Sequence, residues 1–122
     1  MSYALEVIRL AVTTDSSSAD TVSSEQPVVG FVEKCEWQDG TLADGVGATL
    51  SVVGTEDGVD RTLLTLTDAN NDAVYFPREL EDDNTGSALT THTRQAISGY
   101  LKLVISSGGA AKTGGMTVFI LK

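Results

Sequence analysis

The sequence has few of the residues on which catalytic and metal sites usually depend. Its 122 residues include one cysteine, Cys35, and one histidine, His92. A single cysteine excludes an intramolecular disulfide and a zinc site built from cysteines. A Ser-His-Asp triad would have to use His92, and the strained Gly-x-Ser-x-Gly turn that often carries the serine is missing. We therefore predict that the chain is not an enzyme and has no catalytic residues.

Basic residues are also scarce, with 8 Lys and Arg against 17 Asp and Glu and a net charge of -9. Such a chain repels phosphate backbones and anionic membrane surfaces, which argues against nucleic-acid and membrane partners. No apolar run approaches the roughly 20 residues that a transmembrane helix needs. The opening segment carries Glu6 and Arg9 within its apolar stretch, so a strand is a better reading than a secretory signal.

The sequence has no sustained helical periodicity and instead shows short runs in which apolar and polar residues alternate. Between Pro27 and Trp37 the alternation places Val29, Phe31, Cys35 and Trp37 on one face, with the charged residues between them on the other. Such runs, separated by Asp-Gly and Asn-rich turns, predict an all-β fold: a single antiparallel β-sandwich or a jelly-roll-like domain.

Further runs fit the same fold. Ala48, Leu50 and Val52 should point inward in one strand of a hairpin, and Leu64 and Leu66 in the other. Pro77 lacks a backbone donor and should end a strand or mark a sheet edge, whereas residues 89–98 fit a short strand or a loop equally well. The closing residues, 99–122, predict two antiparallel strands joined by a long flexible loop.

Residues 1–26 combine an apolar run with a hydroxyl-rich segment. Residues 3–12 are apolar at nearly every position, which predicts a strand with a bulge or one covered on both faces. Residues 13–26 are rich in Ser and Thr and predict a surface connection, with a short strand at 20–23 as an option. Residues 1–26 are then part of the same fold or an extended arm, and residues 27–122 form the sandwich domain.

One acidic turn has the spacing of a calcium loop. Asp68, Asn70, Asp72 and Glu79 stand at its first, third, fifth and twelfth positions. Ala73, however, replaces the glycine that the sharp turn requires, and a strand rather than a helix follows. We predict an Asx-rich turn, with no metal and no cofactor.

Two other groups could bind small molecules. The glycine-rich stretch before Lys112 lacks the spacing of a phosphate-binding loop, because Ala111 stands where glycine is needed. Trp37, Tyr75 and Phe76 could form a sugar platform, although such aromatics more often belong to the core or to interfaces. Cys35 lies on the apolar face of its strand and is expected to be an inert small hydrophobe.

Three segments in order resemble small β-rich virion proteins of tailed bacteriophages. They are Asp44-Gly45 after a strand, Thr65-Leu66-Thr67 leading to Pro77-Arg78, and the closing Gly-rich stretch from Gly108 to Gly114. The resemblance spans about residues 27–122. The Ser/Thr-rich residues 13–26 depart from the family's pattern.

The resemblance implies a structural protein of the virion, most similar to capsid cement or decoration proteins. Such a protein binds the outer surface of the major capsid lattice, after assembly in the host cytoplasm, and associates with itself, commonly as a homotrimer. Contacts would come from strand edges, the N-terminal segment and the loop at residues 106–115. The alternative is a receptor- or glycan-binding module of a fibre or tail, with Tyr75 or Trp37 facing solvent.

Overall fold

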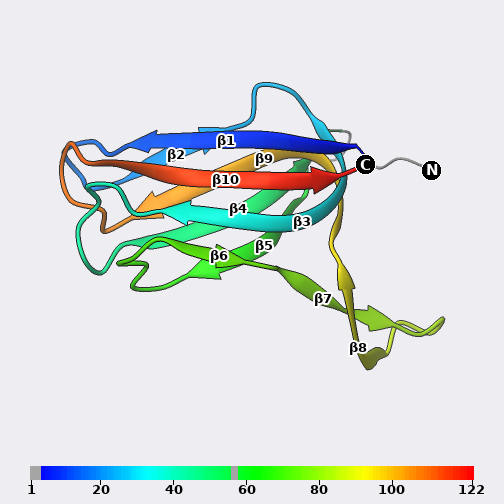
Figure 1. The fold of residues 1–122 in the computed structure, drawn as a ribbon. Helices are drawn as coiled ribbons and strands as arrows, with labels where there is room; N and C mark the ends of the chain where they lie inside the picture. The colour runs from blue at the N-terminus through cyan, green and yellow to red at the C-terminus, as the bar shows by residue number, and fades with distance from the viewer. Residues whose placement is uncertain (1–3, 56–57) are drawn as a thin grey trace.

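The computed structural model describes residues 4–55 and 58–122, and across these ranges the chain is all-β with no helix. Ten strands follow one another (Figure 1). Their bounds are β1 Leu5–Thr13, β2 Asp20–Ser23, β3 Val28–Gln38, β4 Gly47–Gly54, β5 Asp60–Leu66, β6 Ala73–Tyr75, β7 Arg78–Asp82, β8 Ala88–Arg94, β9 Ala96–Ser106 and β10 Thr113–Leu121. The described residues therefore include no helix that is long and apolar enough to cross a membrane.

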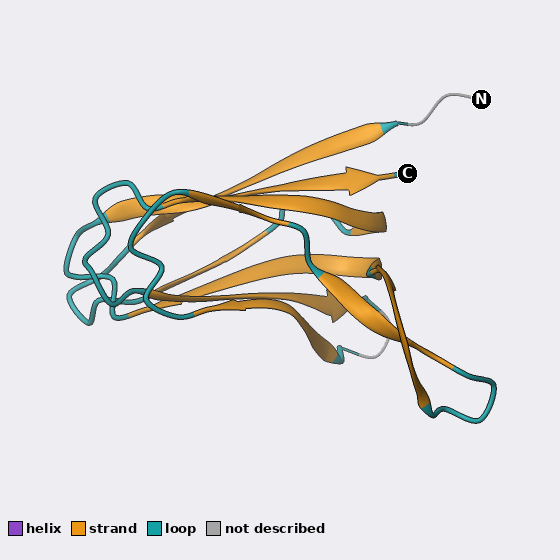
Figure 2. Ribbon diagram, turned by 60° about the horizontal axis from the view of Figure 1, so that its bottom comes forward, coloured by secondary structure: helices purple, strands orange, loops and turns teal. Residues whose placement is uncertain are grey.

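Eight of the strands form two packed layers that share β3 (Figure 2). Residues 28–31 of β3 pair with β9, whereas residues 31–38 pair with β10, and residues 35–37 also pair with β6. We call β1, β10, β6 and the second half of β3 the first layer. The second layer holds β2, β9, β4, β5 and the first half of β3. All pairings are antiparallel, which confirms the predicted sandwich class.

A bulge in β3 overturns part of the predicted alternation. The register with β10 shifts between Phe119 and Ile120, which leaves Glu33 as an extra residue on β3. Cys35 and Trp37 therefore point into the core as predicted, but Val29 and Phe31 point to solvent. The prediction that all four share one face is wrong, because one inserted residue reverses the side-chain phase.

A second bulge changes β5. The register with β4 shifts between Leu50 and Ser51, so Leu63 is the additional residue and lies in the core with Leu66. Leu64, predicted to point inward, is only partly buried against that core. The inward positions of β4, namely Ala48, Leu50 and Val52, are confirmed.

The N-terminal strand is regular. The pairing of β1 with β10 runs without a shift from Leu5 to Thr13, and one face of β1 stays exposed. Neither the predicted bulge nor burial on both faces occurs, because the apolar Leu5 and Val7 are simply solvent-facing. The short strand at residues 20–23 is confirmed as β2, which pairs with β9.

The closing strands do not form the predicted hairpin. β9 lies in the second layer and β10 in the first, with β3 between them in the strand order. The connecting loop is also held by its neighbours: the Gly108 amide donates to the Ser18 carbonyl at 2.9 Å, and the Lys112 amide donates to the Thr14 hydroxyl at 2.8 Å. The expectation of a loose loop is therefore wrong, because buried Thr14 ties the 14–18 and 108–112 segments together.

Candidate interaction surfaces

The two residues considered for catalysis, His92 and Cys35, differ in their exposure to solvent. His92 is exposed on β8, opposite Leu80. Cys35 is fully buried, and desolvation raises the pKa of its thiol to about 12. A thiol with that pKa stays protonated at neutral pH and is a poor nucleophile.

The residues with calcium-loop spacing serve as turn and edge contacts. Asn70 Oδ1 accepts from the Gly45 amide at 2.7 Å, and Asp72 Oδ1 accepts from the Asp39 amide at 2.8 Å. Glu79 instead pairs with Arg61 at 3.2 Å, away from that turn. Among residues 4–55 and 58–122, no three His, Cys, Asp or Glu side chains gather as metal ligands would.

The loops that join the layers meet at one end of the sandwich (Figure 2). This loop end is acidic: desolvation raises the pKa of Asp39, and the nearby carboxylates of Asp44 and Asp72 raise it further. The Ala43 amide donates to the Gly108 carbonyl at 2.9 Å, so two of these loops support each other. The end is thus polar, anionic and internally bonded.

The three aromatic side chains do not form one exposed platform. Trp37 lies in the core, and its indole N–H donates to the Ala69 carbonyl at 2.9 Å. Tyr75 is half-buried against the core, whereas Phe76 is exposed. The part of the sugar hypothesis that needed Trp37 at the surface is therefore contradicted by its burial.

The opposite end carries a feature that the sequence analysis did not predict. β7 and β8 form a separate two-stranded sheet that leaves the sandwich and points away from it (Figures 1 and 2). We call residues 78–94 the projecting hairpin. Every residue of β8 is exposed, and so are residues 80–82 of β7. Its turn is ordered by Asp83, whose carboxylate accepts from the amides of Thr85 and Ser87.

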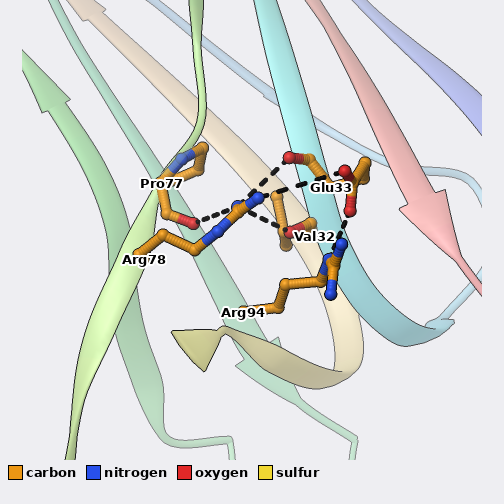
Figure 3. Close-up of polar contacts among 5 residues, drawn as sticks. All are labelled: Val32, Glu33, Pro77, Arg78 and Arg94. Carbon is orange, nitrogen blue, oxygen red and sulfur yellow. Dashed lines mark hydrogen bonds and ion pairs between the residues drawn. The ribbon is translucent and has the colours of Figure 1, made fainter. Parts of the chain in front are cut away.

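Both roots of the projecting hairpin are fastened to one carboxylate (Figure 3). Glu33 forms ion pairs with Arg78, which starts β7, and with Arg94, which ends β8. The Arg78 guanidinium also donates to the Glu33 carbonyl at 3.1 Å and to the Pro77 carbonyl at 2.9 Å. Glu33 is the bulged residue of β3, so the bulge that reverses the side-chain phase along this strand also supplies the anchor.

Hydrogen bonding from Arg94 lowers the pKa of Glu33, and the charges of Arg94, Arg78 and Lys34 act in the same direction against desolvation. A carboxyl group whose pKa is lower in the folded state stabilises the fold above its unfolded-state pKa. That contribution is lost as the pH falls through the folded-state value. The anchor should therefore hold at neutral pH and weaken below the ordinary range of glutamate.

Glu33→Gln should loosen the projecting hairpin while the sandwich stays folded. We expect amide hydrogen exchange in residues 78–94 to become several-fold faster, because an isolated two-stranded hairpin is only marginally stable. Global stability should fall by no more than about 1 kcal/mol, since the ion pairs are partly exposed. Glu25→Gln, on the β2–β3 connection, is the control. Unchanged exchange in the hairpin would contradict this role of Glu33.

A second exposed surface lies on the outer face of the first layer, near the strand ends at which the projecting hairpin leaves. Cross-strand pairing places Leu5 beside Leu121, Val7 beside Phe119, and Phe31 beside Leu121. Leu5, Val7 and Phe31 are 53%, 57% and 47% exposed. We call these five residues the outer apolar patch. Directly opposed side chains lie about 5 Å apart, so the patch is continuous.

Two cations flank the outer apolar patch. The Lys34 ammonium lies 4.6 Å from the centre of the Phe119 ring, and Lys34 pairs with Glu36 at 3.8 Å. Arg9 follows Val7 on the same face of β1 and donates to the Thr117 hydroxyl at 3.5 Å. The patch is therefore apolar at its centre and mainly basic at its rim.

The sequence held a weak signal for the outer apolar patch and almost none for the projecting hairpin. Leu5 and Val7 were predicted to lie in a strand that is bulged or covered on both faces, and Phe31 was predicted to share the face of Cys35 and Trp37. The residues of β8 are three Thr with one each of Ala, Leu, His and Arg, and they show no alternation, because neither face of that strand packs on a core.

Comparison with known proteins adds little to these surfaces. No family model and no curated protein matches the sequence. A chain from a crystal structure of FlhE is similar at a TM-score of 0.40 and 17% identity, over 96% of both chains. A chain from the structure of the infectious bursal disease virus Gt strain gives 0.36 and 19%, over 97% of this chain and 32% of that chain. Likeness this weak carries no functional argument.

Proposed function

We propose that this chain is a structural virion protein that binds the outer surface of a tailed-phage capsid lattice and stabilises the particle. It acts as a cement or decoration protein, with the major capsid protein and further copies of itself as partners. It assembles in the host cytoplasm and ends on the outer capsid surface. The sequence resemblance suggested this class.

One observation carries the proposal: exposed apolar side chains gather at the end with the projecting hairpin. The outer apolar patch and the hairpin lie there, and so does Val29, which is 62% exposed. Contiguous apolar surface of this kind is typical of sites that bind other proteins. Many copies, each bound through a modest interface, can together reinforce a particle by avidity.

The opposite, acidic loop end suits the side that faces water. Its carboxylates repel other anionic surfaces, which keeps a densely decorated particle soluble. We therefore orient the apolar end toward the lattice and the loop end outward. The loop at residues 106–115, offered above as a contact, falls on the outward side in this orientation.

The alternative, a receptor- or glycan-binding module, loses its strongest aromatic. Trp37 is buried, which leaves exposed Phe76 and half-buried Tyr75. A saturable response on a glycan array would favour this alternative over the structural role.

The test is binding of the purified chain to capsids that lack it, measured by co-sedimentation. We expect saturable binding and a higher temperature at which filled particles release DNA. Val29→Glu should weaken binding about tenfold or more, because an interface buries an unpaired charge only at a cost of several kcal/mol.

Ser16→Glu, on the exposed loop end, adds the same charge and is the matched control. It should bind like the unaltered chain. If the unaltered chain did not bind, the proposed function would be contradicted. If both substitutions weakened binding equally, the proposed orientation would be contradicted.

A further inference from the structure

We propose that the projecting hairpin of one copy docks on the outer apolar patch of a second copy, so that copies join head to tail. The inference deepens the self-association part of the proposed function and does not depend on lattice binding. Val29 stays outside both elements and available to the lattice.

Charge selects this pairing over other contacts between copies. Each copy carries a net charge of -9, so most orientations of two copies are repulsive. The hairpin presents Glu81 and Asp82, both exposed, and its two arginines, Arg78 and Arg94, are paired with Glu33 at its root. The rim of the patch carries Arg9 and Lys34, with Glu36 beside Lys34 as its ion-pair partner. Placing the acidic hairpin over that rim brings opposite charges together, which favours the correct register.

Exposed apolar side chains on the projecting hairpin also favour this pairing. Leu80 and Leu89 of the projecting hairpin are 47% and 43% exposed, and neither belongs to the core of the sandwich or packs against it. A two-stranded sheet needs a further layer to be stable by itself. The outer apolar patch of a neighbour provides that layer and is itself uncovered in the single chain.

Geometry makes the contact intermolecular. The projecting hairpin points away from β1 and β10, the strands that carry most of the patch, in both views (Figures 1 and 2). Both of its roots are fastened by Glu33, and these ion pairs favour the direction in which it projects. Two different surfaces then meet, which generates a closed ring or an open filament according to the rotation between copies.

The experiment is charge reversal at each surface, followed by sedimentation velocity of the full chain over a concentration series. Glu81→Lys with Asp82→Lys reverses the hairpin, and Arg9→Glu with Lys34→Glu reverses the rim of the patch. Either pair alone should weaken association about tenfold or more, because like charges then face each other. All four changes in one chain should restore it, since the charges are again opposite.

Asp44→Lys, an exposed carboxylate at the loop end, is the control for a change in net charge and should leave association intact. Circular dichroism of each variant checks that it is folded. Added salt should weaken association of the unaltered chain. A chain that stays monomeric at every concentration would overturn the inference. Association that is weakened by the patch reversal and not by the hairpin reversal would also overturn it, because it would indicate contact between two patches.

Disulfide formation between introduced cysteines tests the same contact without measuring affinity. Mixing Leu89→Cys chains with Val7→Cys chains should give a disulfide between the two kinds, in preference to disulfides within one kind. Native Cys35 does not interfere, because it is fully buried. Preferential pairing within one kind would overturn the inference. Neither experiment contains a capsid, so failure here and failure of lattice binding are separate results.

Discussion

Replacing Trp37 with alanine should lower the free energy of unfolding by about 3–5 kcal/mol. Trp37 is 1% exposed and is the largest fully buried side chain of the core, at the point where β3 pairs with β10 on one side and β6 on the other. Its removal leaves a cavity that rigid strands on both sides cannot close. Urea unfolding followed by circular dichroism measures the loss, since the chain has no other tryptophan to report fluorescence.

Trp37→Phe separates packing from hydrogen bonding. It keeps an aromatic ring but leaves the Ala69 carbonyl without the indole donor, at a cost of about 1–3 kcal/mol. We expect the phenylalanine variant to fall between the alanine variant and the unaltered chain. A loss below about 1 kcal/mol for the alanine variant would mean that Trp37 is not part of a packed core, and the sugar hypothesis would regain its main residue.

Gly99→Ala should destabilise the sandwich by at least about 2–3 kcal/mol, the upper part of the range for overpacked sites. A Cβ at residue 99 would lie 2.1 Å from the carbonyl oxygen of Val53 and 2.8 Å from its carbonyl carbon. Gly99 pairs with Val28 on one side and with Gly54 on the other, so neither neighbouring strand can move freely. Thermal unfolding of the two chains in parallel gives the difference.

Gly86→Ala is the matched control for that substitution. Gly86 has a φ of +87° in the turn of the projecting hairpin, and a Cβ there meets nothing within 4 Å. It should cost about 1–2 kcal/mol of backbone energy at most, confined to the hairpin. Equal destabilisation by the two substitutions would refute the steric account of Gly99.

Local periodicity was a sound guide wherever a strand is regular and half-buried. The alternation of Ala48, Leu50 and Val52 predicted the inward face of β4 because side chains on a strand change sides at each residue. Pro77 was expected to end a strand, and β6 does end at Tyr75, just before it. These features depend only on neighbouring residues, which the sequence shows directly.

Periodicity failed at the bulges, because a bulge depends on the partner strand. Nothing around Glu33 marks it as an extra residue; the shift exists only relative to β10. From that one residue follow the outward positions of Val29 and Phe31, and also the anchor for Arg78 and Arg94. The exposure of Phe31 and the anchor of the projecting hairpin were therefore missed for the same reason that the alternation was misread.

The sequence by itself determined the all-β class, the acidic character and most strand positions, since these follow from composition and from the side-chain period of two along each strand. Only the tertiary structure decided that β9 and β10 lie in different layers, that Thr14 holds the glycine-rich loop, and that residues 78–94 leave the sandwich. Each of these is set by contacts between residues far apart in the chain, and such contacts leave no local periodic pattern.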